Sequence, residues 1–276
     1  MQRASSNKYV VTTLLLLLIG MLGVGATVVA GSERSTTLGI TDDGAGFTLA
    51  GKPTFLKGIS YFGYASGPDL AGLKIDLDAM QQCGVNWLRL WITWQQWSLM
   101  TRDGEIIESR THRLTSLLAE LDRRGLVADL TLNREADASR AVNCGSQQCG
   151  GLANQASHLR GVRALANLTL PYRNVYFDLA NEHDVGDSRF VNHTEIRALR
   201  DAVKSIDADR LVTASSRQIS ATEKLDFLSQ HLDRCKHIRS SNLGVQACTS
   251  SFGAVSQDSD SRCRPAACGS QAKGAR

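Results

Sequence analysis

The chain has 276 residues, of which 42% are apolar and 21% are charged, and this composition excludes a mainly disordered or collagen-like protein. The formal net charge is +4, but residues 235–276 carry six Lys or Arg against two acids, so residues 1–234 are neutral overall. Binding to nucleic acid needs a basic face on the folded body, so we expect no nucleic acid as a partner.

Residues 1–30 have the pattern of an export signal. Arg3 and Lys8 precede an uncharged stretch over residues 9–32, which contains an unbroken leucine run and two small-x-Ala sites, at Ala26 and Ala30. The alternative is a retained membrane anchor, because the stretch is long enough to cross a bilayer. In either case residues from 33 onward are expected outside the cytoplasm, in a secreted or extracytoplasmic protein.

The body of the chain alternates apolar strands with amphipathic helices. We expect strands at 55–63, 85–92, 126–132, 175–180, 211–215 and 225–229, and helices at 73–83, 111–124, 158–168 and 195–206. This alternation predicts an α/β fold with a parallel sheet. A doubly wound sheet and most of a barrel both fit, but no phosphate-binding glycine loop or dinucleotide fingerprint follows the first strand. We therefore expect an incomplete (β/α)8 TIM barrel with about six of its eight units.

Polar residues lie near the ends of three of these strands. Asn181 and Glu182 follow the fourth strand, Arg89 interrupts the apolar second strand, and His231 follows the sixth. The C-terminal ends of barrel strands face one mouth, where a carboxylate beside an amide and a guanidinium suits general acid catalysis. A solvated loop residue remains the ordinary interpretation of Glu182, and a satisfied polar residue that of His231. An arginine in an apolar strand favours a buried pair or a functional role.

Three segments of the chain resemble a known family. The string YFDLANEH, preceded by GVNWLRLWITW and followed by LDFLSQHL, is similar to the clan A glycoside hydrolases, in particular the cellulase-type family 5 barrels. The segment FTLAGKPTFLKGISYFG is similar to the first hairpin and strand of that family. The resemblance covers about residues 46–234.

The resemblance implies retaining hydrolysis of O-glycosidic bonds in a polysaccharide or oligosaccharide, without a metal or a cofactor. Glu182 would be the general acid/base, and Asn181 would bind the sugar 2-hydroxyl. Arg89 would lie beneath the second carboxylate and keep it ionised, and His231 would contact substrate. Four aromatic residues near the mouth would stack on sugar rings or belong to the core: Tyr61, Trp91, Trp94 and Trp97.

The second carboxylate of the family is missing from this sequence. The family's nucleophile is a glutamate at the end of the seventh strand, and no glutamate follows Glu223 here. From about residue 236 the sequence has no helix or strand period, and we favour a frame change or truncation over a natural disordered tail. Glu135 and Asp184 could substitute, but nothing places either opposite Glu182. We expect three parts, 1–30, 38–234 and 235–276, and little or no hydrolysis by the chain as given.

The cysteines predict a local disulfide and leave a zinc site as an alternative. We expect a local disulfide between Cys144 and Cys149 and a buried, apolar role for Cys83. A four-thiolate zinc site with Cys263 and Cys268 is conceivable, but oxidised pairs are commoner in exported chains, so no metal is expected.

Instead of an enzyme, the chain could be a glycan-binding barrel remnant without catalysis, or an ectodomain anchored by residues 9–32. A serine esterase lacks support because no Gly-x-Ser-x-Gly motif occurs.

Overall fold

The computed structural model describes residues 36–64, 70–132, 141–183, 190–216 and 225–230. Residues 1–34 and 35–276 are separate units, and every element below belongs to the second. The expected export signal, His231 and the segment 235–276 lie outside the described residues. None of the helices in the described ranges is long and apolar enough to cross a membrane.

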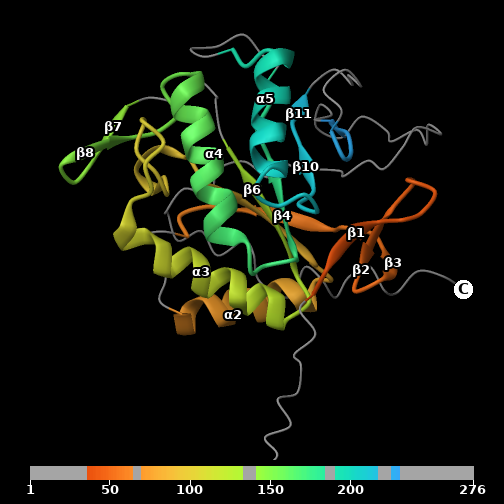
Figure 1. Cartoon of the computed structure of the whole chain (residues 1–276). Coiled ribbons are helices and arrows are strands. Elements are labelled where there is room, and N and C mark those ends of the chain that lie inside the picture. The colour runs from red at the N-terminus through yellow and green to blue at the C-terminus, as the bar shows by residue number, and fades with distance from the viewer. Residues whose placement is uncertain (1–35, 65–69, 133–140, 184–189, 217–224, 231–276) are drawn as a thin grey trace, which may run out of the picture. The chain divides into compact units, whose positions relative to one another are not determined.

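The centre of the fold is a parallel sheet of five strands in the order β10-β9-β6-β5-β4 (Figure 1). These strands are β4 (Gly58–Tyr61), β5 (Trp87–Trp91), β6 (Val127–Thr131), β9 (Val175–Asp178) and β10 (Val212–Thr213). Strands that follow one another in this series are neighbours in space, without the reversal of order that defines a doubly wound sheet. Two short strands continue the parallel series, β11 (Ser215–Ser216) and β12 (Ser229–Gln230). This is the strand order of part of a (β/α)8 barrel, as the sequence predicted.

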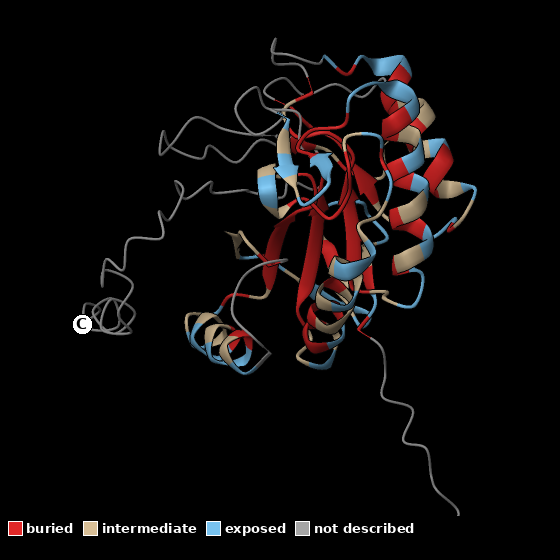
Figure 2. Ribbon diagram, turned by 90° about the vertical axis from the view of Figure 1, so that its left-hand side faces the viewer, coloured by how far each residue is buried: buried red, intermediate tan, exposed pale blue. Residues whose placement is uncertain are grey.

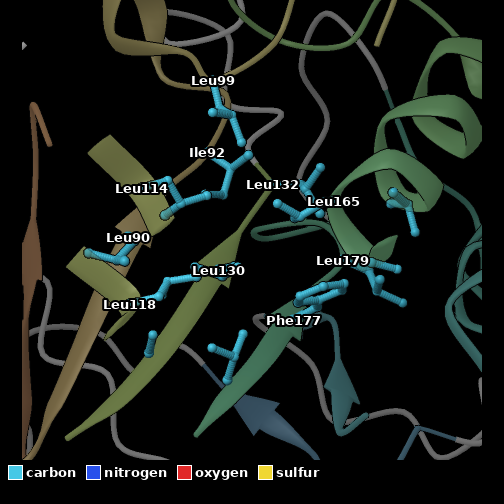
Figure 3. Close-up of a cluster of buried hydrophobic side chains, with 14 of the residues drawn as sticks. Leu90, Ile92, Leu99, Leu114, Leu118, Leu130, Leu132, Leu165, Phe177 and Leu179 are labelled. Atoms are coloured by element: carbon cyan, nitrogen blue, oxygen red, sulfur yellow. The ribbon is translucent and has the colours of Figure 1, made fainter. Parts of the chain in front are cut away.

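Four helices pack against one face of the sheet: α2 (Leu70–Gln82), α3 (Glu108–Arg123), α4 (Gln155–Thr169) and α5 (His193–Lys204). In Figure 2 the strands of the sheet other than the half-buried edge strand β4 are buried, and the exposed residues of α4 and α5 lie on their outer sides. Leu114 and Leu118 of α3 point toward the strands, as Leu165 of α4 does (Figure 3). Asn side chains cap two of the helices, since Asn154 accepts the Ser157 N–H and Asn192 the Glu195 N–H, both at 3.0 Å.

Alternation along the strands sends every second residue to the opposite face of the sheet, the interior of the partial barrel. A three-stranded antiparallel sheet, β1 (Leu38–Ile40), β2 (Phe47–Leu49) and β3 (Lys52–Thr54), contributes to an apolar cluster with this face. The cluster consists of Leu38, Phe47, Leu56, Trp87, Val127, Tyr176 and Phe227. The hairpin implied by the family resemblance is therefore present, and it packs on side chains from the beginnings of the strands.

The elements differ from the predicted ranges mostly at their ends, but the sixth strand is displaced. It begins only at Ser229, whereas the sequence placed it at 225–229. The Asp226 carboxylate accepts the backbone N–H of Val212 at 2.8 Å and lies 2.8 Å from Lys204 Nζ, so this residue ties its segment to β10 and α5 instead of forming a ladder.

The two cysteine predictions have opposite outcomes. Cys144 and Cys149 form a disulfide, as expected, across a hairpin of β7 (Val142–Cys144) and β8 (Gln147–Cys149) that the sequence analysis missed. The prediction for Cys83 is wrong, because this residue is half-buried and disulfide-bonded. It follows the last turn of α2, where the chain comes to the surface before β5.

Candidate active site

Arg89 is the centre of a buried polar network inside the partial barrel. It lies in the middle of β5 and is 2% exposed. Its Nε lies 3.2 Å from Asp129 Oδ2 on β6, and its Nη2 donates to Asp178 Oδ2 on β9. The same Nε donates to Thr131 Oγ1 at 2.8 Å. Three neighbouring strands thus contribute one guanidinium and two carboxyl groups, which pair with one another in the barrel interior.

Burial and mutual attraction set the charges of this network. Burial alone lowers the pKa of Arg89, but the neighbouring Asp129 and Asp178 outweigh it and raise that pKa above its ordinary value. Burial raises the pKa of Asp129 to about 6, and the charge of Asp178 adds to this rise while Arg89 opposes it. The Tyr176 hydroxyl donates to Asp129 Oδ2 at 3.0 Å and accepts the Trp87 Nε1–H at 2.9 Å. The network therefore extends to the apolar cluster at the beginnings of the strands.

The network also extends to the turn that carries Asn181 and Glu182. Asp178 is the last residue of β9, and its Oδ2 accepts the Ser215 hydroxyl at 2.6 Å. Asn181 is 3% exposed and Glu182 is half-buried, directly beyond the C-terminal end of β9. Glu182 has a φ of +48°, a left-handed conformation that costs a non-glycine residue on the order of 1 kcal/mol. Backbone strain of this kind persists only where surrounding contacts hold it.

Aromatic side chains also lie at the C-terminal ends of β4 and β5. The Phe62 and Trp91 rings stack with centroids 5.6 Å apart, and the Trp94 ring packs edge-on to Trp91 at 4.8 Å. Trp91 Nε1 is buried and has no hydrogen-bond partner among the described residues. The guanidinium of Arg89 lies 5.2 Å from the Trp91 ring centroid, which places this indole directly against the polar network.

The structure divides the four aromatic candidates between the site and the core. Trp91 and Trp94 belong to this aromatic cluster, and Trp97 is half-buried near Gly63. Tyr61 lies on the other face of the sheet, against the core between strands and helices, and its hydroxyl donates to Asp76 of α2 at 3.1 Å. Tyr61 is thus a core residue, because alternation in β4 points it away from the barrel interior.

The structure brings together Arg89, Asn181, Glu182 and Trp91, while His231, Glu135 and Asp184 lie outside the described residues. It adds Asp129, Asp178 and Ser215, which the sequence analysis did not name. A signal for the two aspartates was present, because each interrupts an apolar strand at an inward position (LVADLTL and VYFDLA). His183 was also overlooked; it is 3% exposed, and its Nδ1 lies 3.3 Å from the Val191 carbonyl oxygen. Within the described ranges, no group of three or more His, Cys, Asp or Glu could hold a metal ion.

The sequence matches no family model and no curated protein. Among solved structures, the chain is similar to a glycoside hydrolase family 5 mannosidase from Rhizomucor miehei, with a TM-score of 0.55 and 16% identity over 71% of this chain and 62% of that chain. A glycoside hydrolase family 5 protein from Bacteroides vulgatus also has a TM-score of 0.55, with 18% identity over 72% and 45% of the two chains. An exo-beta-1,4-mannosidase from Opitutaceae bacterium strain TAV5 has a TM-score of 0.55, with 17% identity over 70% of this chain and 41% of that chain.

The chain has the fold of the family 5 glycoside hydrolases. The fold implied by the sequence resemblance is therefore confirmed for the described residues, and the chain spans 41–62% of the length of these three structures. At 16–18% identity the likeness concerns the fold alone. What the fold does in this chain has to be argued from its own residues.

Proposed function

We propose that this protein is an exported, glycoside hydrolase-like protein that binds a polysaccharide or oligosaccharide at the C-terminal ends of its strands, with Glu182 as the general acid/base. The observation that carries the proposal is the Asn181–Glu182 turn directly beyond β9, in a barrel of this fold and joined by hydrogen bonds to a buried network. Catalytic residues of α/β barrels lie at this end of the strands. A loop glutamate without a role would not need such support.

In the proposed reaction, Glu182 gives its proton to the glycosidic oxygen as the bond between that oxygen and the anomeric carbon breaks. It then takes a proton from the water that completes hydrolysis. The Asn181 amide binds the sugar 2-hydroxyl, and the half-buried Trp94, backed by the buried Trp91, offers an apolar ring surface to the sugar. A second carboxylate, ~5–5.5 Å from the first in retaining enzymes, must attack the anomeric carbon.

The sequence supplies no glutamate after Glu223 for the second role. We therefore propose that the chain as given binds glycan and can protonate a leaving group, but completes little or no hydrolysis. Among the solved structures of similar fold, two are named as mannosidases, which makes β-linked mannan oligosaccharides the first probes to try.

Export is proposed on the pattern of residues 1–30, and the Cys144–Cys149 disulfide is compatible with an oxidising compartment. An ectodomain retained by residues 9–32 is the alternative form of the same proposal. The sequence of the mature N-terminus distinguishes the two, because signal cleavage removes residues 1–26 or 1–30 and anchoring keeps them.

Binding and turnover of mannan, glucan and xylan oligosaccharides test the function. Calorimetric titration of the full chain and of Glu182→Gln should show saturable binding of at least one oligosaccharide class, with affinities within a few fold of each other, and little product. Azide, a small anionic nucleophile, should then enable cleavage of an aryl β-glycoside by the unsubstituted chain. Absence of both binding and azide-dependent cleavage would contradict the proposal.

The second candidate function is glycan binding without catalysis, which the aromatic cluster of Phe62, Trp91 and Trp94 favours. Saturable binding combined with no cleavage in azide would favour this function over the first. Replacing the indole at Trp94 with alanine should weaken binding in either case, because sugar rings stack on exposed aromatic faces.

A further inference from the structure

The Asn181–Glu182–His183 turn is attached to the neighbouring strand through one residue, Ser215 of β11. The backbone N–H of Glu182 donates to Ser215 Oγ at 3.2 Å, and that of His183 donates to the Ser215 carbonyl at 3.1 Å. Ser215 is fully buried. Ser215 therefore accepts hydrogen bonds from the two peptide units on either side of the Glu182 Cα, which carries the side chain.

The orientation of the Ser215 hydroxyl follows from its partners. A serine hydroxyl has one proton and two lone pairs, and here it donates to a carboxyl oxygen of Asp178. The 2.6 Å contact with Asp178 Oδ2 therefore uses the proton, and a lone pair is left for the Glu182 N–H. The Ser215 N–H donates to the other oxygen of Asp178 at 2.9 Å, so both carboxylate oxygens hold this one serine.

Asp178 is in turn fixed by Arg89, whose Nη2 donates to the same Oδ2. A continuous series of contacts thus runs from a buried guanidinium through Asp178 and Ser215 to the backbone of Glu182. The left-handed φ of +48° at Glu182 is the conformation that this series supports. Without the hydroxyl, the turn loses a bond at the residue whose conformation is least favourable.

We propose that Ser215 is a positioning residue, which directs the Glu182 carboxyl toward the leaving oxygen by fixing the backbone of its turn. The inference rests on the proposed function for its catalytic consequence, although its structural part is independent of it. Ser215 does not touch substrate and acts through the turn, chiefly at the Glu182 backbone, while its Oγ also lies 3.4 Å from Asn181 Oδ1.

The matched control is Thr213, two residues earlier in the chain. It is 1% exposed, and its hydroxyl donates to the Phe227 carbonyl at 2.9 Å, so Thr213→Val also removes a buried hydroxyl near the turn. Among the described residues, however, this hydroxyl does not hydrogen-bond to residues 181–183, and a general loss of stability would affect both variants alike. Ser215→Thr keeps a hydroxyl at the position and serves as the conservative variant.

The test compares the full chain with Ser215→Ala, Ser215→Thr and Thr213→Val in two measurements. The first is the hydrogen-exchange rate of the Glu182 amide, relative to amides in α4. The second is azide-dependent cleavage of two aryl β-mannosides, one with a dinitrophenyl leaving group that needs no proton and one with a phenyl group that does. The ratio of the two rates reports on the delivery of the proton and is insensitive to the amount of folded protein.

We expect Ser215→Ala to accelerate Glu182 amide exchange and to lower the phenyl rate roughly tenfold or more relative to the dinitrophenyl rate, as loss of oriented general acid catalysis should. Ser215→Thr should restore part of that ratio, and Thr213→Val should leave it unchanged. Equal ratios in Ser215→Ala and Thr213→Val would overturn the inference. If the unsubstituted chain cleaves neither substrate, the catalytic part of the proposed function fails for β-mannosides, and unchanged Glu182 exchange in Ser215→Ala would separately overturn the positioning role.

Discussion

Arg89 Nε lies 3.2 Å from Asp129 Oδ2, and the two residues occupy paired positions of β5 and β6 with almost no exposure to solvent. Asp178 contacts the same guanidinium from β9. Taking such charges out of water is costly, and only their close pairing offsets the cost. The interior of the barrel beside the candidate acid therefore depends on all three groups being present together.

Arg89→Met should destabilise the protein by about 3–5 kcal/mol, since it leaves two buried carboxyl groups without their cation. Urea unfolding at neutral pH measures this change. Arg123→Met is the control, because Arg123 is 56% exposed and Glu120, its buried partner, keeps a second cation in Arg124, so the loss should cost under about 1 kcal/mol. A loss at Arg89 no larger than that at Arg123 would show that the network contributes little to stability.

The pH dependence of stability should identify Asp129. Burial raises the pKa of its carboxyl from 3.8 to about 6 in the folded protein, so the folded state binds a proton that the unfolded state has already released. Between these two pH values, the Asp129 contribution to stability should fall as the pH rises. Across this range, the unfolding free energy of the full chain should fall relative to that of Asp129→Asn as the pH rises. Parallel curves would contradict the raised pKa.

The contribution of Glu120 to the pH dependence of stability should have the opposite sign to that of Asp129. Hydrogen bonds from Arg123 lower the pKa of its carboxyl from 4.5 to about 2, and Arg124 adds to this effect. Its stabilisation is therefore present above the unfolded pKa of about 4.5 and is lost as the pH falls toward about 2. Glu120→Gln should cost about 1–2 kcal/mol at neutral pH and far less in acid. A pH-independent cost would mean that packing, and not charge, explains the role of Glu120.

Gly58 should tolerate no side chain. A Cβ at this position would lie 2.0 Å from both the backbone oxygen and the ring of Trp87, so Gly58→Ala must displace β4 or β5. We expect a loss of about 1–3 kcal/mol in thermal or urea unfolding. At Gly46 the nearest atom would be 3.6 Å away, and Gly46→Ala should change stability by about 0.5 kcal/mol or less. Equal effects of the two substitutions would contradict the close contact.

The strands and helices themselves could be predicted from sequence because each depends on local periodicity, whereas the barrel order of the strands was implied by the family resemblance. The leucines of α3 and the apolar strands at 85–92 and 126–132 show that pattern directly. The position of Asn181 and Glu182 beyond the fourth strand was predictable for the same reason. By contrast, the pairing of Arg89 with Asp129 and Asp178 depends on the register of three strands, which no local pattern gives.

Other parts of the site required the folded chain. Ser215 is an ordinary serine in the sequence, and only the placement of β11 beside the Glu182 turn gives it a role. The displacement of the sixth strand depends on one long-range contact, between Asp226 and the backbone of β10. Of the two roles left open for Tyr61, only the folded chain selects the core, because its neighbour Phe62 packs with Trp91 and Trp94.

Glu182 acts as a general acid in the proposed function, and substrates that differ in their need for a proton test this role. Rates of azide-dependent cleavage should be measured for aryl β-mannosides of decreasing leaving-group acidity, with the full chain and with Glu182→Gln. We predict similar rates for the dinitrophenyl substrate and a deficit in Glu182→Gln of roughly 10²-fold or more for the phenyl substrate, because only the latter needs the proton. The same dependence on the leaving group in both proteins would contradict the account.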